Sequence, residues 1–308
     1  NNNGVFRCAC LYDKINYRME KERMIRMEKF LIDMHVHTSE VSACGQVKAE
    51  DGVRMYHSAG YQGMMITDHF HKQYFENLNL ESWEKKIDRY LEGYHKAKVE
   101  GQRLGMEILL GMEFRNYETD NDFLIVGLTE DFLYRHPNLY ELPLAKAIDV
   151  FHENGMLVIQ AHPVRCRIVG IEAGKLYTEY RSEQMLHILE ANPEMEEMSY
   201  NEGMKMLKNT PVEQWKMPLK LKVCDLMCED KLDGIEAYNG NCNWVQEPEK
   251  VKEILERHPE YIQISASDFH GPEHLARGGI VLDRRVKTSQ ELKDALVERD
   301  KIVYSKGR

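Results

Sequence analysis

The sequence has no apolar run long enough to cross a bilayer, and its first residues lack the basic, apolar and small-residue order of a secretory signal. Cysteine is sparse, with seven scattered over 308 residues. The close pair Cys8 and Cys10 does not have the spacing of a zinc knuckle. These absences predict reduced thiols, no membrane contact and a cytoplasmic location.

A dense basic stripe is also missing, and the formal net charge is -10. This balance argues against general nucleic-acid binding. It leaves a nucleotide or a nucleic-acid end open as a substrate, because bound metal ions change the local field at a site. The 43% of hydrophobic and 30% of charged residues are typical of a globular protein, and oligomeric state is not readable.

Residues 1–26 are polar and basic and carry no strand pattern, so we interpret them as an extension outside the folded domain. From residue 27 to 308, short apolar segments alternate with amphipathic ones. The expected strands are 30–34, 64–67, 108–111, 123–127, 157–160, 234–237, 261–265, 279–282 and 302–304, and the expected helices are 49–59, 83–104, 142–154, 248–257 and 289–299. This alternation predicts βα units and a mainly parallel sheet.

One stretch, residues 168–230, departs from this rhythm. It is rich in Glu, Lys, Met and Leu and shows no clear strand, so it predicts a helical insertion. A solvated surface element is the default interpretation of this insertion, and a lid over the site is the alternative.

Metal-capable side chains follow the expected strands directly. They are His35, His37, Asp68, His69, Glu113, His162, Asp268 and His270. Residues two apart on a strand share a face, and the carboxyl ends of parallel strands open on one side of an α/β barrel. A single histidine at a strand end is more often a hydrogen-bonded surface residue than a ligand, but the joint pattern predicts a metal site. Six histidines stand elsewhere and receive no site role: His57, His95, His136, His152, His187 and His258.

The order of these elements resembles the PHP family, the polymerase and histidinol phosphatase domain. The motifs that carry the resemblance are His35-x-His37, Thr67-Asp68-His69, Gly111-Met112-Glu113, Ala161-His162-Pro163 and Ser267-Asp268-Phe269-His270. The resemblance implies a distorted (β/α)7 TIM-like barrel over residues 27–308 with two or three divalent ions (Zn, Mn or Fe). It assigns one ion to His35, His37, Glu113 and Asp268, a second to Glu113 and His162, and a third to His69 and His270.

Two departures from the family pattern bear on the third ion. A further histidine is common soon after the first pair, and another follows the Glu, but neither is present here. Glu40, Cys44 or Asp122 are the candidate substitutes, with fewer ions as the alternative.

The resemblance implies a metal-dependent phosphoesterase that activates a water for attack on phosphorus. We expect Asp68 or His270 to orient or deprotonate the water. Arg165, Arg167 and Arg277 are expected to bind the phosphate of a small phosphorylated substrate, and Arg165 also counts among the catalytic candidates. Glu236, at another strand end, is expected to orient a ligating histidine, with Asn239 as its companion.

Two other functions stay open. An amidohydrolase would share the opening histidine pair but should carry a metal-bridging lysine, for which there is no convincing candidate. A non-catalytic metal-binding regulatory module would tolerate the two departures. The substrate itself is not readable: histidinol phosphate, a nucleotide, an oligonucleotide end and a phosphoprotein all remain candidates.

Overall fold

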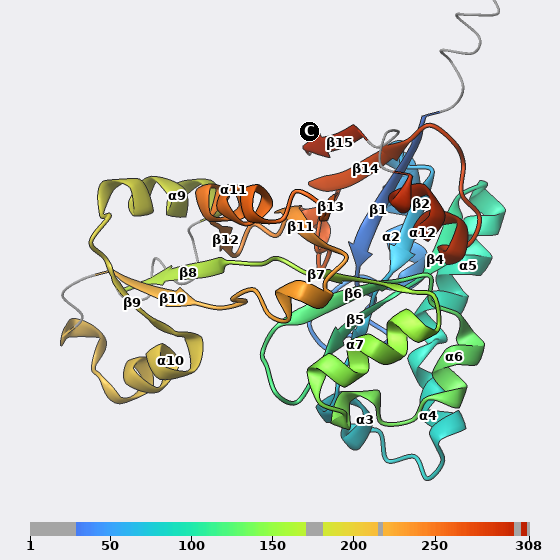
Figure 1. Cartoon of the computed structure of the whole chain (residues 1–308), viewed down its shortest axis with the longest axis horizontal. Helices are drawn as coiled ribbons and strands as arrows, with labels where there is room; N and C mark the ends of the chain where they lie inside the picture. Colours follow the sequence, from blue (N-terminus) through green and yellow to red (C-terminus); the bar gives the residue numbers. More distant parts are fainter. Residues whose placement is uncertain (1–28, 171–180, 215–217, 299–302, 307–308) are drawn as a thin grey trace, which may run out of the picture.

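The computed structural model describes residues 29–170, 181–214, 218–298 and 303–306. The described chain forms a mixed α/β body of two adjoining sheets with helices packed around them, and a smaller sheet extends from one end of this body (Figure 1). The expected extension, residues 1–26, lies outside the described residues. No helix in the described ranges is long and apolar enough to span a membrane.

The first sheet has five strands in the order β15-β14-β1-β2-β4. Their bounds are β15 Val303–Lys306, β14 Gly278–Leu282, β1 Phe30–Val36, β2 Gly63–Ile66 and β4 Glu107–Leu110. β1, β2 and β4 run parallel, whereas β14 is antiparallel to both of its neighbours. The parallel core brings the ends of β1 and β2 to the same edge, where the first predicted ligands stand.

The second sheet has six strands in the order β13-β11-β7-β6-β5-β3. They are β13 Ile262–Ala266, β11 Gly234–Asn239, β7 Leu157–Gln160, β6 Asp122–Val126, β5 Met112–Arg115 and β3 His69–Phe70. β7, β11 and β13 are parallel, but β6 is antiparallel to both neighbours. The strand predicted at residues 123–127 is therefore present as β6, but it runs antiparallel to its neighbours and not parallel as the βα pattern predicted.

The two sheets are continuous along the chain on one side, where β2 leads into β3 and β4 into β5. On the other side the end of β1 and the loop after β13 are joined by an isolated bridge between Val36 and Phe269, with backbone hydrogen bonds of 3.0 Å on each side of it. The described residues thus show a mixed α/β arrangement of separate ladders. The seven-stranded barrel implied by the resemblance is not seen as one closed ring.

Helices cover the outside of these sheets. They are α2 Ala49–Ser58, α3 Lys72–Asn77, α4 Trp83–Tyr90, α5 Glu92–Leu104, α6 Glu130–Arg135, α7 Leu144–Glu153, α11 Pro248–Arg257 and α12 Ser289–Val297. The single helix expected at 83–104 divides at Leu91, and Gly105 ends it in the left-handed region at φ 73°. Four 3-10 turns complete the connections: η1 Leu139–Glu141, η2 Val212–Gln214, η3 Glu229–Lys231 and η4 Pro272–His274.

Successive residues of a strand enter different cores. On β2, Met64 and Ile66 pack with the helices α2 and α5, while Met65 joins a second core that includes residues of β1, β7, β13 and α12. This alternation follows from the two-residue period of a strand. Strands buried on both faces are held rigidly, and the side chains at their ends are correspondingly fixed.

The stretch expected to be a helical insertion is only partly helical. The helices α9 Ser182–Ala191 and α10 Tyr200–Asn209 are present, but β8 Arg165–Val169, β9 Glu196–Ser199, β10 Leu219–Lys222 and β12 Val245–Gln246 form a four-stranded sheet in the order β12-β8-β10-β9. β9 reads Glu-Glu-Met-Ser, which has no apolar alternation, and its strand state comes from parallel pairing with β10. This sheet has two small cores of its own.

Candidate metal centre

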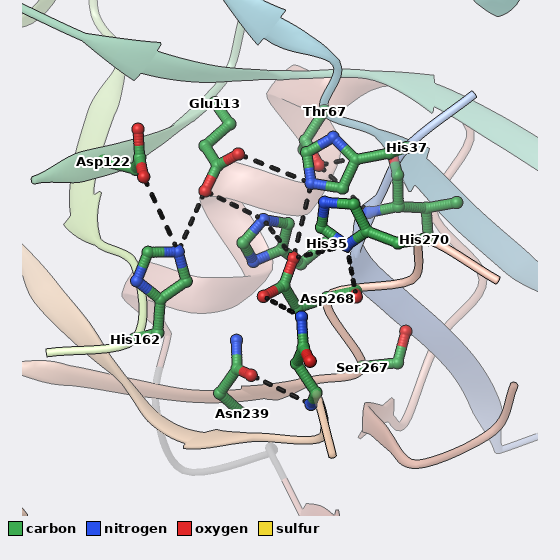
Figure 2. Close-up of polar contacts among 12 residues, drawn as sticks. His35, His37, Thr67, Glu113, Asp122, His162, Asn239, Ser267, Asp268 and His270 are labelled. Atoms are coloured by element: carbon green, nitrogen blue, oxygen red, sulfur yellow. Dashed lines mark hydrogen bonds and ion pairs between the residues drawn. The ribbon is translucent and has the colours of Figure 1, made fainter. Parts of the chain in front are cut away.

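The two histidines at the end of β1 face two carboxylates. His35 Nε2 lies 3.2 Å from Glu113 Oε1 and 3.4 Å from Asp268 Oδ1. His37 Nε2 lies 3.4 Å from Glu113 Oε2 and 3.4 Å from Asp268 Oδ1. All four side chains are buried. Residues of β1, β5 and the loop after β13 therefore meet at one point, as the strand-end pattern predicts (Figure 2).

Glu113 on β5 also contacts two histidines from other strands. Its Oε1 lies 3.0 Å from His162 Nε2, and its Oε2 lies 2.7 Å from His69 Nδ1. One carboxylate thus touches four imidazoles and has the geometry to bridge two ions. Asp268 likewise faces several imidazoles, because its Oδ1 lies 3.2 Å from His270 Nδ1 in addition to its contacts with His35 and His37.

Two of these residues adopt left-handed backbone conformations. His162 has φ 30° and Asp268 has φ 51°, each directly after a buried strand. Such conformations are uncommon for residues other than glycine and cost of order 1–3 kcal/mol. They turn the chain sharply at the strand end and direct both side chains into the cluster.

Several ligand-type atoms in this cluster are buried and have no hydrogen-bond partner. They are His35 Nε2, His37 Nε2, His69 Nδ1, Glu113 Oε2 and Asp268 Oδ1. They approach one another at the distances above but without hydrogen-bond geometry. An unsatisfied buried polar atom costs roughly 1–3 kcal/mol, more if it is charged. Imidazole and carboxylate groups that converge in this way fit divalent ions such as Zn, Mn or Fe.

The possible ligand sets follow from the spacing of these atoms. In each of four groups, the donor atoms lie within 4.8 Å of one another: His37, His69 and His270; His35, His37 and Glu113; His35, His162 and Asp268; and His69, Glu113 and Asp122. The groups overlap at His35, His37, His69 and Glu113. Every metal ligand predicted from the sequence lies in at least one group.

The electrostatics of the ion-free cluster favour ionised carboxylates. Burial alone would raise the pKa of Glu113, but the charges of His69 and His35 hold it well below its usual value. The pKa of Asp268 is lowered in the same way by His35 and His270. Burial, together with the charges of His270 and His69, lowers the pKa of His37. The site thus combines anionic carboxylates and a neutral His37 with other histidines, such as His35 and His270, whose pKa these carboxylates raise. An ion would displace the protons of those histidines on binding.

Glu236 on β11 orients two of the histidines. Its Oε1 lies 3.1 Å from His35 Nδ1, and its Oε2 accepts hydrogen bonds from the His162 backbone N–H at 2.7 Å and from Asn239 at 2.8 Å. A carboxylate on Nδ1 fixes the tautomer that leaves Nε2 free for a metal. Glu236 and Asn239 therefore occupy the orienting positions that the sequence suggested.

Asp68 lies behind the cluster. Its carboxylate accepts hydrogen bonds from the Thr38 backbone N–H at 2.8 Å, the Thr38 hydroxyl at 2.7 Å and the Ser42 hydroxyl at 2.6 Å. Ser42 Oγ in turn lies 3.2 Å from His37 Nδ1. The contacts of Asp68 suit a residue that positions His37 through Ser42, and it does not line the cavity.

A cavity of about 470 Å³ opens beside the cluster. Its lining includes His69, Glu113, His162, Asp268 and His270 together with Arg115, Arg165, Arg167 and Trp244. The Arg165 and Arg167 guanidinium carbons lie 4.8 and 5.4 Å from the centre of the Trp244 ring. Cation–π contacts of this kind hold the two guanidinium groups at the cavity wall.

Arg277, the third arginine expected at the substrate, is placed elsewhere. It lines a neighbouring cavity of about 510 Å³, and its Nε donates to the Glu273 carbonyl at 2.8 Å. Gly240 packs against its backbone, where an added Cβ would lie 3.0 Å from the Arg277 carbonyl oxygen. The structure thus brings Arg165 and Arg167 to the cluster but not Arg277.

Further residues at the site are Asp122, which the sequence offered only as a substitute ligand, and Asn241 and Trp244, which were not singled out from the sequence. Asp122 is buried, accepts two hydrogen bonds of 2.7 Å from Arg115, and lies 3.8 Å from His162 Nε2. Asn241 donates to Asp268 at 3.1 Å, and Trp244 stacks on the arginines. The position of Asp122 could have been inferred from the sequence, because it stands at the start of the strand that follows Glu113. Asn241 and Trp244 stand in a loop without a motif.

Structural comparison finds a related fold at low sequence identity. A two-domain protein of Bacteroides vulgatus ATCC 8482, which contains a predicted PHP-like metal-dependent phosphoesterase, matches with a TM-score of 0.51 and 17% identity over 91% of this chain and 65% of that one. The present chain therefore spans about two thirds of that protein. No family model and no curated protein sequence matches the chain.

Two other solved structures are more distant. A candidate metal-dependent phosphoesterase from Bifidobacterium adolescentis ATCC 15703 has a TM-score of 0.40 and 14% identity, covering 86% of this chain and 95% of that one. An amidohydrolase from Chromobacterium violaceum has a TM-score of 0.39 and 13% identity, covering 89% and 97%. The resemblance to PHP-type proteins expected from the motifs is confirmed at the level of the fold by the Bacteroides structure.

Proposed function

We propose that this protein is a hydrolase that cleaves a phosphoester with the help of two or three divalent ions. The observation that carries the proposal is the convergence of buried, unpartnered imidazole nitrogens and carboxylate oxygens beside a cavity lined by arginines. The metal-binding half of this arrangement is common to several hydrolase classes. The arginines favour an anionic substrate, and phosphate matches the planar guanidinium group.

The proposed ligand sets follow the contacts in the cluster. His35, His37, Glu113 and Asp268 would hold one ion, and Glu113 and His162 a second. His69 and His270 would hold a third. When bound, such ions supply a water of lowered pKa and neutralise charge on phosphoryl oxygens.

The protein side chains would perform the remaining steps. Arg165 and Arg167 would bind the phosphate from the side of Trp244 and orient it toward the cluster. His270 lines the cavity and is partly exposed, so in a site that holds only two ions it would be placed to take up or release a proton at the reacting water. Asp68 would act indirectly, by holding Ser42 against His37.

The cavity favours a small substrate. Its volume of about 470 Å³ lies in the range of roughly 300–1,000 Å³ that is usual for small-molecule sites. A phosphorylated metabolite is therefore the proposed substrate class, with a nucleotide among the candidates. An amidohydrolase is less well supported, because none of the described residues that line the cavity is a lysine.

The proposal is tested by elemental analysis of the purified protein together with hydrolysis of an aryl phosphate, a bis-aryl phosphate and an aryl amide. We expect two or more ions per chain and phosphate release that is lost on chelation and restored by metal. Amide cleavage without phosphate release would indicate an amidohydrolase. Bound metal without any turnover would indicate a binding module. A chain that binds no ion after reconstitution would refute the proposal.

A further inference from the structure

The loop after His37 places a thiol at the edge of the histidine cluster. Cys44 is a free cysteine in the connection between β1 and α2, and it lines the 470 Å³ cavity together with His69 and His270. Its side chain and the imidazoles of both histidines therefore face one cavity. Cys44 thus lies beside His69 and His270, the two histidines that are the proposed ligands of the third ion.

Hydrogen bonds on both sides of Cys44 fix its position. Two residues before it, Ser42 Oγ donates to Asp68 at 2.6 Å and accepts from the His69 backbone N–H at 3.1 Å. Two residues after it, the Gln46 backbone N–H donates to the His270 carbonyl at 2.7 Å. The loop is therefore tied to both histidine-bearing segments, and the thiol is held at the cluster.

The neighbouring histidine atoms point to a ligand. His37, His69 and His270 offer donor atoms within 4.8 Å of one another. Among them, His37 Nε2 and His69 Nδ1 are buried without a hydrogen-bond partner, and His37 as a whole is only 1% exposed. These orphaned nitrogens are an observation independent of the cysteine, and they indicate that the cavity wall next to Cys44 binds a cation.

The other acidic candidates near this position have partners of their own. Glu40 caps α2 through a 3.0 Å hydrogen bond from the Ala49 backbone N–H and lies 3.6 Å from Lys96. Asp122 is held by Arg115 and approaches His162 rather than His270. Asp122 also lies near His69, but its carboxylate is held by Arg115. Cys44 lines the cavity beside His69 and His270 and is not held by an arginine or lysine among the described residues.

We propose that Cys44 is a ligand of the ion held by His69 and His270, which makes this position a mixed cysteine and histidine site. The inference rests on the proposed function for the presence of the cluster ions. Thiolate with imidazole selects thiophilic ions such as Zn, whereas the carboxylate-rich position at Glu113 and Asp268 also suits Mn. The two ends of one cluster would therefore differ in metal preference.

The test is reconstitution of the full chain with Co(II), which reports sulfur ligation through a sulfur-to-cobalt charge-transfer band in the near ultraviolet. The unmodified protein should show this band. Cys44→Ser should lose it and release one ion, with a fall in affinity at that position larger than the roughly 10–100-fold typical of outer-shell changes. Cys44→His should retain the ion without the band. Cys228→Ser, at a partly buried free cysteine near η3, should keep both.

A second readout uses thiol alkylation followed by peptide mapping. Zn should protect Cys44 from alkylation at least ~10-fold relative to the chelated protein, in line with the affinity of such a ligand set, and should leave Cys228 unaffected. A charge-transfer band that persists in Cys44→Ser, or Cys44 alkylation that Zn does not slow, would overturn the inference. Failure of the chain to bind any Co(II) would instead refute the proposed metal centre as a whole.

Discussion

Two largely buried cations of the small sheet, Arg165 on β8 and Lys220 on β10, differ in their partners. Lys220 Nζ lies 2.7 Å from Glu197 and 2.6 Å from Glu247. Arg165 lies 3.8 Å from its nearest carboxylate, Asp268, and its buried Nε has no hydrogen-bond partner. A cation matched by anions of the protein stabilises the sheet. A cation that faces a cavity with incomplete pairing is available to an anionic ligand.

The same distinction separates the metal centre from the rest of the molecule. Asp33, a buried carboxylate outside the cluster, is satisfied: it accepts from the Tyr56 hydroxyl at 2.8 Å and from the backbone N–H groups of His35 and Ser267 at 3.1 and 3.2 Å. At the strand ends, buried nitrogens and oxygens face one another without hydrogen bonds. Unsatisfied buried groups of this kind persist where function compensates for their cost.

The largest expected effect comes from the centre of the unsatisfied cluster. Glu113→Gln removes the charge that faces four imidazoles while keeping the volume of the side chain. We expect loss of at least one ion per chain by elemental analysis and a fall in hydrolysis rate of more than ~100-fold, because the variant loses metal-based charge stabilisation. Retention of the full ion content would contradict the bridging role.

Arg165→Gln tests the available cation. Charge-assisted hydrogen bonds contribute about 1.5–3 kcal/mol, so kcat/KM for an aryl phosphate should fall ~10–100-fold with ion content unchanged. Arg284→Gln is the control, because Arg284 is partly exposed, pairs with Glu298 at 2.9 Å and does not line the cavity. Equal kinetic losses in both variants would remove the proposed role of Arg165.

Lys220→Met tests the satisfied cation. Breaking a buried ion pair costs roughly 3–5 kcal/mol, and Glu197 is 42% exposed, so we expect a loss nearer to ~2 kcal/mol in the free energy of unfolding. Denaturant titration measures this, and ion content should not change. Lys222→Met, on the same strand but 40% exposed, should change stability by less than ~0.5 kcal/mol. Loss of metal in Lys220→Met would contradict the conclusion that Lys220 stabilises the small sheet without affecting the metal cluster.

The smallest effect is expected at a surface histidine with two carboxylate partners. His258 lies 2.8 Å from Glu229 and 3.1 Å from Glu260, and these contacts raise its pKa. A raised folded-state pKa gives stability that is fully present below the unfolded value of about 6.5 and is lost as pH rises through the folded value. His258→Gln should therefore destabilise the protein by less than ~1 kcal/mol at pH near 6 and not at pH near 9. A difference that is independent of pH would show that packing, not charge, is lost.

Much of the cluster was predictable because it depends on local pattern. An apolar strand followed at once by histidine or carboxylate places that side chain at a strand end, and parallel strands bring their ends together. His35, His37, Glu113, His162 and Asp268 follow this logic, and the structure brings them within contact distance. Which of them bind metal stays a prediction.

The departures arise where non-local contacts decide. Asp68 follows its strand like the others, yet Thr38 and Ser42 draw its carboxylate behind the cluster. Arg277 follows the last motif as Arg165 follows His162, but it lies in the neighbouring cavity. Side-chain direction in loops depends on such partners, which spacing does not reveal.

The sequence by itself determined the alternation of strands and helices and the chemical identity of the strand-end residues, since hydrophobic periodicity and residue type are local properties. Only the tertiary structure decided the reversed direction of β6, the small sheet of β8, β9, β10 and β12, and the difference between the full pairing of Lys220 and the incomplete pairing of Arg165. These features depend on contacts between segments distant in the chain, and such contacts override weak local preferences when they satisfy buried backbone and charged groups.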